Sequence, residues 1–250
     1  MKRAYDRGDL HRKIDRLTDG QADVVGGFVD AVLAPMHSER LPATWLTVPA
    51  WEDAFLARLR GHHGLSKDPL STTQFEAAFN ESCLAAGWQV EVAASATQRF
   101  FDTTITVAGS RPRRLSLKAS SAKDMSIRRV HISKLTEAAW IQDVRRKTDR
   151  RDRIVSLFRE YESVTSSIVM LRGFRGREGC AVYYELLEIP TAIFAPVARL
   201  TVDQAQLGTI KVPDADLPDF AIRVDRSDAK ITVTSIRLDL CVIHGRWGVG

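Results

Sequence analysis

A chain of 250 residues with 44% hydrophobic and 27% charged residues has the composition of a globular protein with a sizeable core. It has no apolar run near the roughly 20 residues of a membrane helix, and its polar first residues do not resemble a signal peptide. The three cysteines are far apart and lack CxxC spacing, which argues against a disulfide framework or a structural zinc site. We therefore expect a reduced, cytoplasmic protein.

Apolar periodicity predicts a helical N-terminal subregion over residues 1–70, in which the last helix begins at Pro49. A polar loop that includes two adjacent histidines is expected at 61–69. A further helix is expected at 71–87, where a glycine ends it. Strands follow in the predicted order 89–93, 101–107 and 115–119.

In the second half, the pattern over 132–162 predicts a helix that is strongly charged on one side. A short helix is expected at 190–199. Further strands are predicted at 167–172, 181–187, 231–238 and 241–244. Together these elements predict one α/β domain over residues 1–250, with a mixed central sheet flanked by helices, and the core begins at about residue 71.

Asp102 and Lys118 are the first candidates for chemistry. The strands at 101–107 and 115–119, joined by a turn at 109–114, predict a hairpin that holds the two side chains together near one end of the sheet. A magnesium-dependent phosphodiesterase needs such a pair, because the carboxylate holds the cation and the ammonium lies beside the attacking water. The simpler alternatives are an aspartate that belongs to a turn and a lysine that is merely exposed.

A second acid is expected on another element, because Asp102 alone would bind magnesium weakly. On the helix at 71–87, Glu76 lies at the flank of the apolar face with Asn80 one turn on, whereas Glu81 points to the far side, toward solvent. Glu76 is therefore the better ligand, directly or through water. The residues of the apolar or small face are Phe75, Ala78, Phe79, Ser82, Cys83 and Ala86.

Glu76 has a second possible role at the start of its helix. Thr73 and Glu76 have the spacing of a capping box, in which the glutamate binds back to the first residue of the helix. Ser71 and Gln74 have the same spacing two residues earlier. Both readings of Glu76 stay open on the sequence alone.

Positive charge is concentrated in residues 111–153. This segment holds 14 basic and 5 acidic residues, a net charge of +9, which leaves −4 for the rest of a chain whose total is +5. Such a surface suits a phosphate backbone, although a charged run is often only a solvated helix face. His131 could also be a general base or a structural residue. The candidate DNA contacts are Ser120, Lys123, Arg128, Arg129, His131 and Lys134.

Six segments in order resemble the SmaI family of type II restriction endonucleases, which have the PD-(D/E)xK nuclease fold. The first contains Glu76, the second begins at Asp102 and the third ends at Lys118. The resemblance spans about 71–247, and residues 1–70 match only in being helical. The segments are 75–82, 102–105, 117–118, 131–134, 187–190 and 241–247.

This resemblance implies a restriction-endonuclease-like fold and a homodimeric, Mg²⁺-dependent enzyme that cuts double-stranded DNA at a short palindrome. A GC-rich site of the CCCGGG type, a blunt cut and 5′-phosphate ends are implied as well. Asp102 and Glu76 would hold the metal with the backbone carbonyl of Leu117, and Lys118 would orient the nucleophile. Ser116, which stands where the superfamily usually has a second acid, would be a family trait.

Two other functions stay open. A repair or recombination nuclease of the same fold would recognise DNA structure rather than a palindrome. A catalytically inactive DNA-binding regulator would also fit if Ser116 marks a real loss of the second acid. Cleavage of plasmid DNA would separate these functions.

Overall fold

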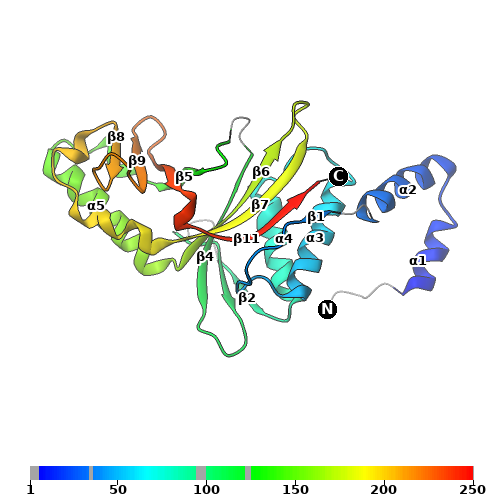
Figure 1. The fold of residues 1–250 in the computed structure, drawn as a ribbon. Coiled ribbons are helices and arrows are strands. Elements are labelled where there is room, and N and C mark those ends of the chain that lie inside the picture. Colours follow the sequence, from blue (N-terminus) through cyan, green and yellow to red (C-terminus); the bar gives the residue numbers. More distant parts are fainter. Residues whose placement is uncertain (1–5, 34–35, 94–99, 122–124, 250) are drawn as a thin grey trace.

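The computed structural model describes residues 6–33, 36–93, 100–121 and 125–249. Within these ranges the chain forms a seven-stranded sheet, a separate four-stranded sheet and helices that cover them (Figure 1). The molecule combines helices with a sheet of parallel and antiparallel strands, so the predicted α/β class with a mixed central sheet is confirmed. None of the described helices is long and apolar enough to cross a membrane.

The N-terminal subregion is helical, as predicted. The adjacent histidines end a helix instead of lying in a loop, because His62 binds the backbone carbonyl of Asp68 (2.6 Å) and His63 binds the hydroxyl of Tyr184 (2.9 Å). These contacts hold the helix end against the sheet. The helices of the first half are α1 (Arg7–Ile14), α2 (Asp19–Leu33), α3 (Pro49–His63) and α4 (Thr72–Ala85).

The larger sheet has the strand order β1-β11-β7-β6-β4-β3-β2. Only the central pair β4 and β6 is parallel, and every other neighbouring pair is antiparallel, which makes the sheet mixed. Its strands are β1 (His37–Ser38), β2 (Gln89–Val92), β3 (Thr103–Thr106), β4 (Arg113–Ser120), β6 (Ser167–Arg175), β7 (Ala181–Pro190) and β11 (Val242–Gly248).

The prediction of one helix over 132–162 was wrong. The segment begins with a strand, continues through a short 3₁₀ turn and becomes α5 (Lys147–Val164) only in its second half. Val130 and Ile132 alternate with exposed residues and are buried, so tertiary packing decides for a strand here. The basic segment at 111–153 therefore crosses two strands and a helix start, which excludes a single solvated helix face.

The four-stranded sheet is antiparallel and has the order β5-β10-β9-β8. Only β10 was predicted as a strand, since β8 and β9 were not predicted and β5 lies in the segment expected to be helical. The expected short helix after Pro190 is present as the 3₁₀ helix η2 (Thr191–Arg199). The strands of this sheet are β5 (Arg129–Glu137), β8 (Thr209–Val212), β9 (Phe220–Asp225) and β10 (Lys230–Arg237).

Two apolar cores lie on opposite faces of the central strands. Ile168 and Met170 of β6 belong to the core formed with α5 and the four-stranded sheet. Val169 and Leu171, the residues between and after them, belong to the core formed with α3 and α4. Side chains of a strand alternate between faces, so β6 serves both cores. Figure 1 shows α5 and the small sheet on one side of the large sheet and α3 and α4 on the other.

Candidate active site

Asp102 and Lys118 lie side by side, as the hairpin pattern predicted. The Nζ atom of Lys118 is 3.5 Å from Oδ2 of Asp102. Asp102 directly precedes β3 and does not open it, and its amide donates to the carbonyl of Leu115 on β4 (2.9 Å). This backbone bond holds the aspartate over the strand that carries the lysine.

The Asp102 carboxylate has two further donors on β4. The amide of Leu117 donates to Oδ2 (2.6 Å), and the Ser116 hydroxyl donates to the same atom (3.2 Å). These bonds leave the other carboxylate oxygen, Oδ1, for a ligand. In an extended strand the N–H and C=O of a residue point to the same side, so the carbonyl of Leu117 also points toward Asp102.

Glu76 is half-buried on α4 and lies within electrostatic range of this pair. Burial raises its pKa, the negative charge of Asp102 raises it further, and the positive charge of Lys118 lowers it. Asn80 lies one turn further along the helix, on the same side. Its Oδ1 atom is buried and has no hydrogen-bond partner among the described residues.

The capping alternative for Glu76 is excluded. Ser71 caps α4, and its side chain and that of Gln74 form both bonds of a capping box. Glu81 does not point freely into solvent, as the sequence suggested, because it accepts hydrogen bonds from Nε (3.1 Å) and Nη2 (2.9 Å) of Arg58 on α3. Glu81 therefore contacts α3, whereas Glu76 is within range of the charges of Asp102 and Lys118.

Tyr161 of α5 is a neighbour of the site that the sequence did not reveal. It is fully buried, and its hydroxyl has no hydrogen-bond partner among the described residues. Burial raises the pKa of Tyr161, the nearby Ser116 hydroxyl lowers it and the charge of Asp102 raises it. The tyrosine therefore stays neutral and closes the site on the α5 side. Nothing in the local pattern of α5 distinguishes it from an ordinary core aromatic residue.

The oxygen atoms at this place suit a hard divalent cation. Mg²⁺ is usually bound by one or two carboxylates while it keeps several waters and contacts substrate phosphates. Asp102 and Glu76 supply two carboxylates, and Asn80 offers an unpaired amide oxygen. In the part of the chain that the structure describes, no group of three or more His, Cys, Asp or Glu side chains is placed to hold a metal alone.

The predicted DNA contacts nearest to Lys118 follow it along the chain. Ser120 is half-buried at the end of β4, and Arg128 is exposed just before β5. Lys123 lies outside the described residues. Ser120 and Arg128 are therefore both accessible to a ligand in solution.

Two of the predicted contacts are engaged within the fold. The guanidinium of Arg129 donates to the carbonyls of Pro218 (3.4 Å) and Ser235 (3.1 Å). Lys134 pairs with Glu137 at 2.8 Å, on the exposed surface. Arg129 therefore has a structural function, whereas Lys134 can exchange its weak surface partner for a phosphate.

His131 is exposed on β5 and lines a groove over the four-stranded sheet with Arg223 and Lys230. Partial burial and the nearby charge of Arg223 lower its pKa. Neither Asp102 nor Lys118 lines this groove. The structure therefore separates His131 from the acid–lysine pair.

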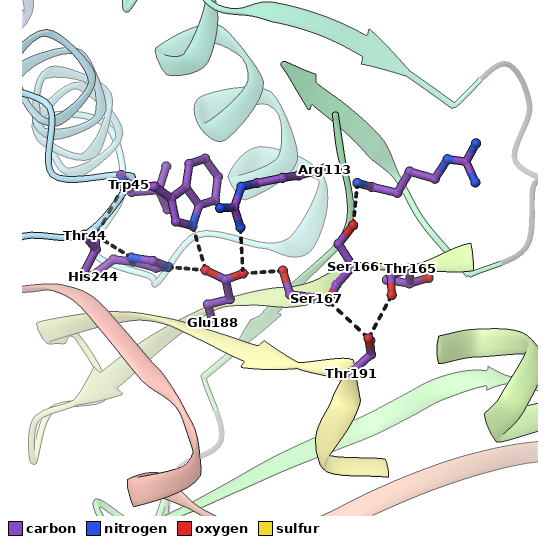
Figure 2. A network of polar contacts seen from close by, with 11 residues as sticks. Thr44, Trp45, Arg113, Thr165, Ser166, Ser167, Glu188, Thr191 and His244 are labelled. Carbon is purple, nitrogen blue, oxygen red and sulfur yellow. Dashed lines mark hydrogen bonds and ion pairs between the residues drawn. The ribbon is translucent and has the colours of Figure 1, made fainter. Parts of the chain in front are cut away.

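A polar network around Glu188 braces the sheet beside the site (Figure 2). The Glu188 carboxylate accepts hydrogen bonds from Trp45 Nε1 (2.7 Å), His244 Nε2 (3.0 Å) and Ser167 Oγ (2.5 Å). Arg113 approaches it to 3.9 Å. Ser167 pairs with Leu115, so the network fixes β4 at the level where Asp102 is held.

Burial by itself would raise the pKa of Glu188. The hydrogen bonds from His244, Ser167 and Trp45 outweigh this effect and lower the pKa to about 2. No local sequence pattern identified Glu188 as an important residue. The signal that could have found it is an acid inside an apolar strand, which must be paired if it is buried.

The mixed sheet flanked by helices, with a lysine on β4 beside an acid that directly precedes the neighbouring β3, has the architecture of a restriction-endonuclease-like nuclease. The profile of the SmaI family, described as a type II site-specific deoxyribonuclease, matches residues 12–249. The chain belongs to this family and is a type II site-specific deoxyribonuclease.

A curated relative agrees with this assignment. The chain is 28% identical over 207 residues to a protein of Serratia marcescens named type II restriction enzyme SmaI, and the match covers 78% of each chain. No solved structure matches the chain at a significant level.

Proposed function

We propose that the chain is a Mg²⁺-dependent restriction endonuclease that acts as a homodimer on a short GC-rich palindrome of the CCCGGG type. It cuts both strands bluntly and leaves 5′-phosphates. Its action takes place in the cytoplasm, on foreign DNA. The observation that carries the proposal is the 3.5 Å approach of Lys118 to Asp102, with the half-buried Glu76 in the field of both.

Asp102 and Glu76 hold the metal in this proposal, and the carbonyl of Leu117 contributes to the same site. A bound Mg²⁺ supplies charge that stabilises the phosphorane-like transition state and lowers the pKa of a water. The Lys118 ammonium donates to the attacking water and orients it toward the phosphorus atom. Attack there forms a bond from the water oxygen to phosphorus and breaks the P–O3′ bond, so the phosphate stays on the 5′ oxygen of the downstream fragment. The attacking water gives up a proton to solvent, and the departing 3′ oxygen takes one from solvent.

Ser116 takes part through Asp102. Its hydroxyl donates to Oδ2, as does the Leu117 amide, so the carboxylate cannot rotate away from the site. The acid that is missing at this position is supplied from α4. The site therefore has its two carboxylates on two different elements.

A palindrome presents the same base edges twice about a two-fold axis. A dimer with two-fold symmetry reads both halves and places one active site on each strand. The proposed contacts to DNA are Ser120, Lys123, Arg128, His131 and Lys134.

The central test is cleavage of plasmid DNA by the purified chain and by Asp102→Asn and Lys118→Met. Asp102→Asn keeps the shape and the acceptor oxygen but removes the charge that binds a cation. We expect discrete fragments with Mg²⁺, none with a chelator, and a loss of about 100-fold or more for both variants. Asp53→Asn, the same change on the exposed side of α3, serves as the control.

The same experiment separates the alternatives. Sequencing the fragment ends gives the site, the cut position and the position of the phosphate. Cutting confined to branched or mismatched DNA would instead indicate a repair nuclease. Tight binding without cleavage under any divalent cation would indicate an inactive regulator and would overturn the proposal.

A further inference from the structure

A small cavity at the far end of α5 is lined by several arginines. It has a volume of about 100 Å³ and lies where the start of α5 meets the turn after β9. No acidic residue is among the described residues that line it. The lining residues that matter here are Trp140, Arg145, Arg146, Arg150, Gln206 and Arg226.

Three of the four arginines of this cavity have no carboxylate partner among the described residues. Arg146 pairs with Asp149 at 3.0 Å on the surface. Arg145, Arg150 and Arg226 form no ion pair with any residue that the structure describes. Like charges at close range repel each other, so the arrangement is unfavourable unless an anion joins it.

Arg150 bears most of this cost. It is partly buried, and its Nε atom is buried without a hydrogen-bond partner among the described residues. Burial lowers its pKa, and the neighbouring charge of Arg226 lowers it further. A guanidinium stays charged at neutral pH in spite of such a shift. A buried N–H that points at no acceptor is therefore available to a ligand oxygen.

The cavity is built by bonds that hold its two sides in place. The Gln206 amide donates to the carbonyl of Lys147 (3.2 Å), which fixes the chain beside the first turn of α5. The Gln142 amide donates to the carbonyl of Arg226 (3.5 Å), and Arg145 donates to the carbonyl of Gln142 (3.1 Å). The arginines therefore converge from the start of α5, the segment just before it and the turn after β9.

We propose that this cavity binds a tetrahedral phosphate, and that the phosphate belongs to the DNA backbone outside the cut site. The assignment to DNA rests on the proposed function, whereas the phosphate chemistry rests on the guanidinium cluster alone. Arginine pairs with phosphate through two parallel N–H···O bonds, and several such forks can share one phosphate. The N-terminus of α5 adds positive potential at the same place.

The position on α5 gives the contact its use. Tyr161, near Ser116 and Asp102, is on the same helix, eleven residues after Arg150. At about 1.5 Å of rise per residue, about 17 Å of helix separates the cavity from the site. Figure 1 shows α5 extending from the sheet to the edge of the molecule. A backbone phosphate held there would anchor the duplex at a second point, distant from the scissile bond.

The first test uses inorganic phosphate and thermal unfolding, without DNA. Phosphate should raise the Tm of the wild-type chain by about 2 °C or more at saturating concentration. The Arg150→Gln/Arg226→Gln variant should lose this rise, and its Tm without phosphate should be equal to or above the wild-type value because a repulsion is removed. Arg16→Gln, an exposed arginine on the opposite side of the molecule, should keep the rise.

The second test measures binding of a duplex that carries the mapped site, in chelator, at several salt concentrations. In the double variant, the magnitude of the negative slope of log K against log salt should decrease by about 0.9 for each cavity that no longer binds a phosphate. The slope for Arg16→Gln should be unchanged. If phosphate does not raise the Tm of the wild-type chain, the proposal that the cavity binds phosphate is refuted. Protection together with an unchanged slope would overturn its assignment to DNA.

The two proposals fail in different ways. A wild-type chain that binds no duplex would defeat the proposed function, and the DNA assignment with it. If the wild-type chain cuts DNA normally, and the double variant has the same salt slope and the same Tm response to phosphate, only the proposed phosphate site is refuted.

Discussion

Glu76 is a carboxyl group in a place that disfavours its charge. Burial and the charge of Asp102 raise its pKa, and only Lys118 opposes them. A carboxyl group with a raised pKa in the folded state contributes stability below its unfolded pKa and loses it as the pH rises through the folded value. The ionised form of Glu76 therefore destabilises the fold, as expected of a residue whose charge a bound cation would neutralise.

Glu76→Gln should therefore act in opposite directions on stability and on activity. We expect a higher Tm at pH 7, because a disfavoured charge is removed, and a loss of metal-dependent cleavage of about 100-fold or more. Thermal unfolding and plasmid cleavage measure the two effects. Glu81→Gln on the same helix is the control, since it weakens the pair with Arg58 on α3 and should cut almost normally. Loss of activity in the control instead of the variant would refute the choice of Glu76.

The pH dependence of cleavage follows from the same residue. A metal ligand must be deprotonated, so a raised pKa of Glu76 moves the loss of metal binding to higher pH than an ordinary glutamate would show. We expect the acid limb of the cleavage rate to shift toward lower pH when the Mg²⁺ concentration is raised. A limb that does not respond to Mg²⁺ would show that another group controls it.

Glu188 is the opposite case, a buried charge that the fold satisfies. Its pKa of about 2 lies below the ordinary 4.5, so its stability contribution is present above pH 4.5 and disappears as the pH falls toward 2. Glu188→Gln should lower the free energy of unfolding by about 3 kcal/mol at pH 7. Urea unfolding at pH 7, 5 and 3 should show the gap between wild type and variant closing only below pH 4.5. A constant gap would contradict the charged network.

At the scale of elements, local patterns predicted α4 and the β3–β4 hairpin well. Both have a regular apolar period and clear ends, such as the cap at Ser71 and the glycine at position 109, whose φ is 76°. That regularity was enough to bring Asp102 and Lys118 together and to place Glu76 at the edge of the apolar face. The parts of the candidate site that depend on local pattern were therefore predictable.

The same reasoning failed where tertiary packing decides. Residues 129–137 carry six polar and three apolar side chains, and burial of the apolar ones, with pairing to β10, makes them a strand. Tyr161 and Glu188 reach the site region from elements that are distant in the sequence. The proximity of Tyr161 to Ser116, and the bond of Glu188 to His244, could not be predicted from spacing alone.

The bulge in β11 gives a test at this scale. Its register shifts between Ile243 and Gly245, and a side chain on Gly245 would collide with the buried indole of Trp247. Gly245→Ala should therefore lower the free energy of unfolding by about 1–3 kcal/mol, measured by urea denaturation. Gly208→Ala, where a methyl group meets no atom within 4 Å, should have little effect. Equal effects of the two changes would refute the steric explanation.

At the scale of the whole molecule, the charge is distributed unevenly. Residues 111–153 carry a net charge of +9, and their described part forms β4 in the large sheet, β5 in the small sheet and the start of α5. The N-terminal helices lie on the other side of the large sheet from α5, as Figure 1 shows. A polyanion is therefore attracted to the half of the molecule that contains both the acid–lysine pair and the arginine cavity.

The double use of β6 has a consequence for how the protein unfolds. Ile168 and Met170 face one core while Val169 and Leu171 face the other, so neither core can open without exposing one side of a wall that the other needs. We therefore expect a single cooperative transition in calorimetry, with equal calorimetric and van't Hoff enthalpies. Two resolved transitions would mean that the halves melt independently. Because both cores share β6, a destabilising substitution in either core should lower the stability of the whole enzyme.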